Sequence, residues 1–167
     1  MSSSPEEWAA TAASLFYNKR YSQAMHCYER AGLMREKAVA HAYTLREAAR
    51  SAPIHPRAGS NETSQAEAYA IAAEAFVASA REAVTEKLVY YRIAAECFVH
   101  CEDHFQAAQA YRSALEYDLA AQHFRKAGKF DEAVQVVKSH KDEMNVTVVE
   151  SITEVSKLYF LREQEVE

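Results

Sequence analysis

The chain is poor in the two residues that most often interrupt helices. It has three glycines and three prolines among 167 residues. Both are costly in a helix interior, whereas alanine, which is abundant here, is the most favourable residue there. The composition therefore predicts helix almost everywhere and argues against a sheet-rich fold. So few glycines, at positions 32, 59 and 128, also exclude a G-x-x-x-x-G-K-[ST] phosphate loop.

Cysteine, long apolar runs and positive charge are scarce as well. The three cysteines cannot all pair within one chain, and nothing in their spacing indicates a disulfide framework. No run approaches the roughly 20 apolar residues that cross a bilayer, and the opening MSSSPEEW lacks the apolar core of a signal peptide. The formal net charge of −5 argues against a nucleic-acid-binding domain, which is more often basic. We therefore expect an intracellular protein of the cytoplasm or nucleus, with no membrane partner.

What the sequence does contain is a repeat of thirteen residues. Four units begin at Tyr91, His104, Tyr117 and Phe130, and weaker units begin at Trp8, Tyr21 and Met34. Three residues into each of the four units the column reads Ala94, Ala107, Ala120 and Ala133. Seven residues in, it reads Phe98, Tyr111, Phe124 and Val137. Such a period predicts short helices that bury their apolar faces only by stacking on their neighbours, with alanines and aromatics packed between them.

The local signals predict roughly nine helices in a single domain over 1–167. Ser4 and Glu7 form a capping box at the first helix, and Gly32 is suited to a left-handed helix end. Helices are expected at 5–18, 21–31, 35–50, 65–83, from 85 onward in thirteen-residue units, and at 145–162. We expect Thr85, Asp103, Asp118 and Asp131 to cap helices. Residues 51–64 hold two of the three prolines and predict an internal loop.

The pattern resembles the tetratricopeptide repeat. The matching residues are Trp8, Ala12, Leu15, Ala24, Tyr28 and Ala31, and then Tyr91, Ala95, Phe98, Ala107, Tyr111 and Ala114. Thr11 and Ala94 depart from it, because the family usually has leucine there. The third pair of helices also follows after 26 residues, from Tyr91 to Tyr117, instead of the customary 34. The resemblance implies an all-α fold of antiparallel helical hairpins stacked as a right-handed superhelix. It also implies a protein or peptide partner bound in the inner groove.

Longer stretches resemble a more specific group. The segments YSQAMHCYERAGLMREKAVAHAYTLREAAR and YYRIAAECF…AAQHFRKAGKFDEAVQVV are similar to the helical region of large fungal proteins with a UvrD-like superfamily I helicase core. Those proteins are similar to the animal protein that joins tetratricopeptide and ankyrin repeats to such a helicase. Since the phosphate loop is missing here, the resemblance implies an accessory module without the motor. We therefore expect a non-catalytic protein-interaction scaffold, part of a larger helicase-type protein and without a cofactor.

Four residues close together in the sequence are of types that bind metal ions. Cys97, His100, Cys101 and His104 follow a C-x-x-H-C-x-x-H spacing, which puts all four on one face of a continuous helix. Both residue types bind zinc, but four ligands from one straight helix rarely converge on a tetrahedral ion. In addition, Cys101 and His104 fall in repeat columns that packing residues fill elsewhere. We therefore predict no metal site and consider these four residues the only candidates for one.

Two surface features leave alternatives open. Basic residues gather in the middle of the chain, at Arg35, Lys37, Arg46, Arg50 and Arg57. They form either a solvated face balanced by neighbouring glutamates, which we favour, or a patch for an acidic partner or a nucleic-acid backbone. The apolar segment Leu158–Leu161 has three interpretations. It packs on the preceding helices, continues into a longer protein, or docks on another subunit in a self-associating module.

Overall fold

The computed structural model describes residues 2–166 as a stack of α-helices. Their order is α1 (Pro5–Tyr17), α2 (Tyr21–Ala31), α3 (Met34–Ser51), α4 (Gln65–Glu82), α5 (Lys87–His100), α6 (His104–Ser113), α7 (Tyr117–Lys126), α8 (Phe130–His140), the 3₁₀ turn η1 (Lys141–Glu143) and α9 (Val146–Val166). Residues 2–166 contain no strand. The predicted all-α fold of stacked helical hairpins is confirmed.

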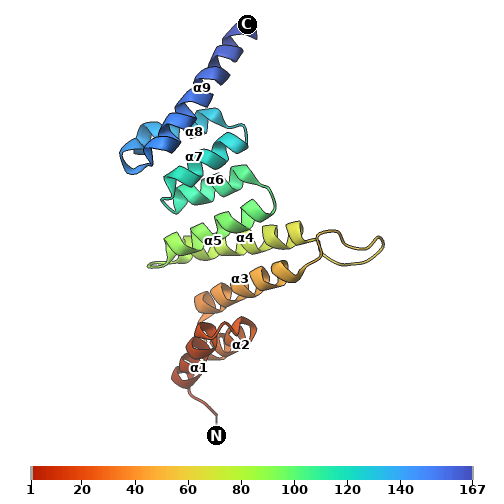
Figure 1. Cartoon of the computed structure of the whole chain (residues 1–167). Coiled ribbons are helices and arrows are strands. Elements are labelled where there is room, and N and C mark those ends of the chain that lie inside the picture. The colour runs from red at the N-terminus through yellow and green to blue at the C-terminus, as the bar shows by residue number, and fades with distance from the viewer. Residues whose placement is uncertain (1, 167) are drawn as a thin grey trace.

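The stack is elongated, because each helix packs most extensively on the helices before and after it in the chain. Figure 1 shows α1 and α2 at one end and α9 at the other, with the distal part of α9 extending past its neighbours. The loop between α3 and α4 projects to one side. Across the described residues, no helix combines the length and apolarity needed to cross a lipid bilayer.

Five of the helix-to-helix turns share one geometry, and this geometry explains the thirteen-residue period. Each contains one residue with a left-handed backbone, and these residues are Lys19, Gly32, Glu102, Leu115 and Gly128. The next N–H then donates to a carbonyl in the last turn of the helix, at 2.8–3.0 Å, which is the Schellman arrangement. The accepting residues are Leu15, Tyr28, Phe98, Tyr111 and Phe124. All five occupy the seventh position of their repeat unit, so the helix end recurs at a fixed place in the unit.

The predicted helix caps are confirmed in part. Ser4 and Glu7 form the capping box of α1, and Asp103 caps α6 by accepting from the Gln106 N–H. The prediction for Thr85 is wrong, because α5 begins one residue later, after Glu86, without a side-chain cap.

The other two predicted aspartate caps lie inside first turns. Asp131 lies in the first turn of α8. Asp118 lies in the first turn of α7, where its carboxylate accepts from the Asn145 N–H at 3.0 Å. Asp118 thereby ties α7 to the start of α9 instead of capping its own helix.

The buried residues form two cores. The alanine column at 94, 107, 120 and 133 is fully buried, and Phe98, Tyr111 and Phe124 pack beside it in a main core that spans α3 to α9. Alanine lets neighbouring helix backbones approach closely, and the aromatic rings fill the remaining space. A smaller core joins α1, α2 and the start of α3, and consists of Ala12, Ala24, Cys27, Tyr28 and Ala40.

A chain of aromatic rings connects the two cores. Phe16 contacts Tyr43 edge to face at 5.2 Å between ring centroids, and Tyr43 contacts Phe76 in the same way at 5.0 Å. Tyr21 stacks on Tyr43 at 4.8 Å. These four rings come from α1, α2, α3 and α4, so they fix the N-terminal hairpin against the central helices.

The loop after α3 lies where the sequence predicts it. It spans 52–64, and its ends meet where the Gln65 N–H donates to the Pro53 carbonyl at 2.8 Å. Ser64 and Glu67 then form a capping box that starts α4. Because α3 and α4 pack directly on each other, the loop is an excursion between two adjacent helices.

Candidate functional site

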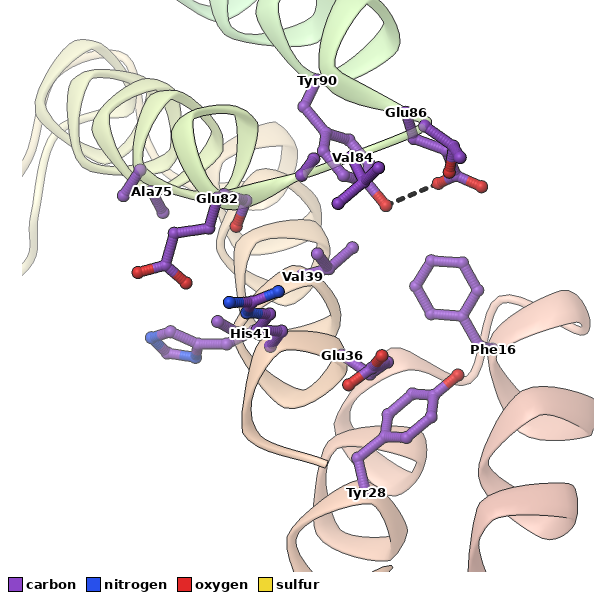
Figure 2. A pocket seen from close by; sticks show the side chains of 16 residues that line it. Phe16, Tyr28, Glu36, Val39, His41, Ala75, Glu82, Val84, Glu86 and Tyr90 are labelled. Atoms are coloured by element: carbon purple, nitrogen blue, oxygen red, sulfur yellow. Dashed lines mark hydrogen bonds between the residues drawn. The ribbon is translucent and has the colours of Figure 1, made fainter. Parts of the chain in front are cut away.

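The candidate site is a pocket of about 680 Å³ where the α1–α2 hairpin meets the central helices. We call it the α1–α5 groove. Figure 2 shows side chains from five helices and from the short α4–α5 connection surrounding one opening. The residues that matter for its chemistry are Phe16, Tyr28, Arg35, Glu36, His41, Glu82, Val84, Glu86 and Tyr90.

Two buried tyrosines supply hydroxyl groups to the groove. Burial, followed by the nearby charge of Glu36, raises the pKa of Tyr28 above its ordinary value. Burial also raises the pKa of Tyr90, with a further contribution from its 2.6 Å hydrogen bond to Glu86. Both phenols therefore stay protonated at neutral pH. Figure 2 shows the Tyr90 hydroxyl donating to the Glu86 carboxylate at one side of the opening.

Carboxylates outnumber cations around the groove. Glu36, Glu82 and Glu86 come from α3, α4 and the α4–α5 connection, and all three are exposed. Among the residues that the structure describes, none of them forms an ion pair. Arg35 is the single guanidinium in the lining. The groove is therefore an acidic opening.

Apolar surface accompanies these charges. Val84 is 88% exposed on the α4–α5 connection, at the margin of the groove. Phe16 also lines the groove, and its ring contacts Tyr21 and Tyr43 edge to face. The site thus offers carboxylates, phenol hydroxyls and apolar contacts within one opening.

The four metal-ligand candidates do not come together. Cys97 is buried in the main core, and burial raises the pKa of its thiol to about 12. His100 is exposed and stacks on Tyr69 at 4.3 Å. The Cys101 thiol donates to the Phe98 carbonyl.

The physical reason is a helix end that falls within the motif. Helix α5 ends at His100 and α6 begins at His104, so the four residues do not share one continuous helix. His104 turns instead toward His123 on α7, with 3.1 Å between the two Nδ1 atoms. Within residues 2–166, no three histidine, cysteine or carboxylate side chains are grouped so that they could hold a metal ion.

The basic residues of the central region are mostly engaged with other side chains. Lys37 pairs with Glu29 at 3.2 Å. Arg50 pairs with Glu47 at 2.7 Å, and Arg57 with Glu62 at 3.7 Å. These pairs are what a solvated, charge-balanced face would show.

The other two basic residues have different surroundings. The Arg46 guanidinium lies 4.9 Å from the Tyr43 ring centroid and 5.9 Å from that of Phe76, and its Nε atom is buried without a hydrogen-bond partner in the described residues. Arg35 lines the α1–α5 groove at the opposite end of α3. Because the cations extend along the whole of α3 and into the loop, they do not form one compact patch.

The apolar segment near the C-terminus is largely exposed. Leu158 is 65% exposed and Leu161 is 57% exposed, whereas Tyr159 is partly buried against the ring of Phe130. Of the three interpretations offered by the sequence, complete burial on the preceding helices is not what the structure shows.

The scan against protein-family models and the searches of curated proteins and of solved structures found no match to this chain. The interpretation of the α1–α5 groove therefore depends on its own geometry. Sequence reasoning did not bring this lining together, because the residues are scattered from 16 to 90 and share no common motif. Three lining residues were named in advance, each for another role: Tyr28 for packing, Thr85 as a helix cap and Arg35 for a different surface.

Proposed function

We propose that this chain is a non-catalytic protein-interaction scaffold that binds a basic segment of a partner protein in the α1–α5 groove. The observation that supports this best is the set of three carboxylates, none of them ion-paired, around an opening with aromatic walls. An arginine or lysine side chain would neutralise charges that the fold leaves unpaired. Hydrogen bonds between such a cation and a carboxylate are stronger than bonds between neutral groups.

The remaining lining fits the rest of such a side chain. The methylene stem of arginine or lysine covers apolar surface while its charged head stays polar, and Val84 and Phe16 offer such surface. Cations are also attracted to the faces of tyrosine and phenylalanine rings. Arg35 would help to orient the bound segment, because it repels a cation from its own side of the groove.

The test uses two short fluorescein-labelled peptides, one alternating arginine with alanine and the other alternating glutamate with alanine. Fluorescence anisotropy should show binding of the arginine peptide to the whole chain and none of the glutamate peptide. Replacing the three groove carboxylates, as Glu36→Gln, Glu82→Gln and Glu86→Gln together, should weaken binding at least about tenfold.

The matched control changes the same number of charges elsewhere. Glu74, Glu96 and Glu150 are exposed and lie outside the groove, so their combined replacement by glutamine removes the same number of negative charges. Retained affinity in this control identifies the groove as the binding site. Equal losses in both triple variants would mean that the peptide only senses the acidity of the whole chain, and the proposed site would be wrong.

A nucleic-acid-contacting role is the weaker alternative. It would use the basic residues of α3 and the loop, three of which pair with glutamates. Arg50→Glu is the best probe, because Arg50 is exposed, whereas Arg46 packs against aromatic rings. If binding of a labelled DNA duplex were steeply salt-dependent and lost in Arg50→Glu, this alternative would replace the peptide proposal.

We further propose, on the sequence resemblance alone, that the chain is an intracellular, tetratricopeptide-like accessory module of a larger UvrD-like helicase-type protein. Its support is the repeat pattern and the two quoted stretches. An immunoblot of source cells with an antibody to this region should detect a polypeptide far longer than 167 residues. A band at the mass of the isolated chain would contradict the proposal.

A further inference from the structure

A second opening lies at the far end of the stack, between α8 and α9. It is a pocket of about 580 Å³ with an apolar floor that includes Val134, Val137, Ile152 and Phe160. We call it the α8–α9 groove. Its margin carries Lys138 and Lys157, both exposed, and none of the described residues that line it is acidic.

The helix that forms one wall of this groove also presents apolar residues to solvent. Phe160 and Leu161, which both line the groove, are 38% and 57% exposed. In Figure 1 the distal part of α9 extends past α7 and α8, so no other described helix covers it. Leaving apolar surface in water is unfavourable by about 25 cal/mol for each Å², so this face favours a partner.

We propose that α9 is a self-association surface on which α9 of a second copy lies antiparallel, about a twofold axis near Phe160 and Leu161. The inference is independent of the function proposed for the α1–α5 groove. A twofold axis between 160 and 161 brings the apolar side chains of both copies together at the centre. It also places the last turns of each α9 in the α8–α9 groove of the other copy.

Charge complementarity favours a second copy as the occupant. The distal turns of α9 carry Glu163 and Glu165, both exposed, and one cation, Arg162, so they are acidic on balance. In the antiparallel arrangement, position 157 of one helix lies opposite position 164 of the other. The acidic turns of each copy therefore meet Lys138 and Lys157 of its partner, and the same contacts are made twice, as an interface with twofold symmetry requires.

A buried polar atom in the groove wall supports the same arrangement. The Ser156 hydroxyl is buried and has no hydrogen-bond partner among the described residues. A buried hydroxyl without a partner is costly. The second copy's Gln164 arrives at this level of the groove and brings an amide that can both donate and accept.

The experiment measures the mass of the whole chain in solution by light scattering and sedimentation equilibrium. We expect a dimer in the wild-type protein at concentrations of about 100 µM. Leu161→Glu places a charge at the centre of the interface and should raise the dissociation constant at least about tenfold. Because Leu161 is exposed in the single chain, the variant should keep its helical circular dichroism.

A matched control and a charge exchange complete the test. Ile71→Glu changes an equally exposed apolar residue on α4, far along the stack, and should leave the dimer intact. Lys157→Glu and Glu163→Lys should each weaken the dimer, and the double variant should recover part of the loss. A monomeric wild-type protein, a dimer unaffected by Leu161→Glu, or equal loss in Ile71→Glu would each overturn the proposal.

Discussion

At the scale of single residues, His123 shows how the stack limits the chemistry of a buried side chain. It is 6% exposed and lies between the rings of Tyr111 and His104, with centroid distances of 5.4 and 5.3 Å. The 3.1 Å contact between the Nδ1 atoms of His123 and His104 requires one ring to donate and the other to accept. Burial, then the charge of Lys126 and the neighbouring His104, lowers the pKa of His123 to about 4.

This lowered pKa predicts a loss of stability in mild acid. The unfolded chain takes up a proton on this histidine near pH 6.5, whereas the folded chain does so only near pH 4. Between these values the unfolded state holds more protons, so the free energy of unfolding falls as the pH falls. The loss attributable to His123 should reach roughly 2–3 kcal/mol, as measured by urea denaturation at pH values of about 7 and 4.5.

The comparison that isolates His123 is the change between the two pH values in wild type and in His123→Gln. Carboxylates contribute to the acid sensitivity of both proteins and cancel in the difference. His26→Gln alters an exposed histidine on α2 and should retain the wild-type response. If His123→Gln were as acid-sensitive as the wild type, burial of a neutral His123 would not be a source of this sensitivity.

Residue-level predictions from the sequence succeeded where a column fixed the environment. The burial of Ala107, Ala120 and Phe124 followed from the repeat, because every unit uses the same positions for packing. The environment of His104 did not follow from it. Its contact with His123 joins residues on different helices, and no local spacing encodes that distance.

At the scale of helices and turns, the five left-handed residues offer a direct test of how the repeat is built. Only Gly32 and Gly128 are glycines, and the other three positions carry side chains at φ between 58° and 62°. Residues with a Cβ lose roughly 1–2 kcal/mol in this conformation. The chain therefore retains avoidable strain in its turns.

Leu115→Gly should stabilise the protein. Leu115 has φ of 61° and is 55% exposed, so glycine removes backbone strain while giving up little buried apolar surface. We expect the free energy of unfolding to rise by about 0.5–1 kcal/mol in urea denaturation, because the larger entropy of glycine in the unfolded chain offsets part of the relief.

Two further variants test whether a side chain in the left-handed turn causes the strain. Leu115→Ala keeps the Cβ and should bring no gain. Gly128→Ala makes the opposite change at a similar turn, with φ of 74°, and should destabilise by about 1 kcal/mol. Equal stability of Leu115→Gly and Leu115→Ala would show that the left-handed turn is not strained by its side chain.

The helices and turns of the repeat units could be predicted because their boundaries recur every thirteen residues. The turns near 102–103, 116 and 128–129 were located from the period, although two of them lack glycine. The four metal-ligand candidates span one of these turns, so they do not share one continuous helix. The α1–α5 groove could not be predicted in this way, because its width depends on how five helices are held apart by aromatic contacts far apart in sequence.

At the scale of the whole molecule, the two cores raise the question of whether the stack unfolds as one unit. The α1–α2 hairpin buries its own small core and joins the remainder through α3 and the ring of Tyr43. In stacked helical proteins, stability is approximately a sum over units and their interfaces with neighbours. Weakening one interface should therefore loosen one end of the stack more than the other.

Tyr43→Ala tests this coupling. It removes the contacts with Phe16, Tyr21 and Phe76, and it takes away the ring on which the Arg46 guanidinium lies. We expect the free energy of unfolding of the whole chain to fall by about 2–4 kcal/mol. Amide hydrogen exchange should accelerate in α1 and α2 while α5 to α8 stay protected.

The control for this variant lies at the other end of the stack. Tyr117 is also partly buried, and it stacks on His140 at 3.6 Å, far from the bridging rings. Tyr117→Ala should destabilise the molecule without selectively exposing α1 and α2. Uniform acceleration of exchange in Tyr43→Ala would mean that the two cores act as one cooperative unit. The α1–α5 groove would then be a rigid opening, whereas selective acceleration would show that its walls separate when this single ring is removed.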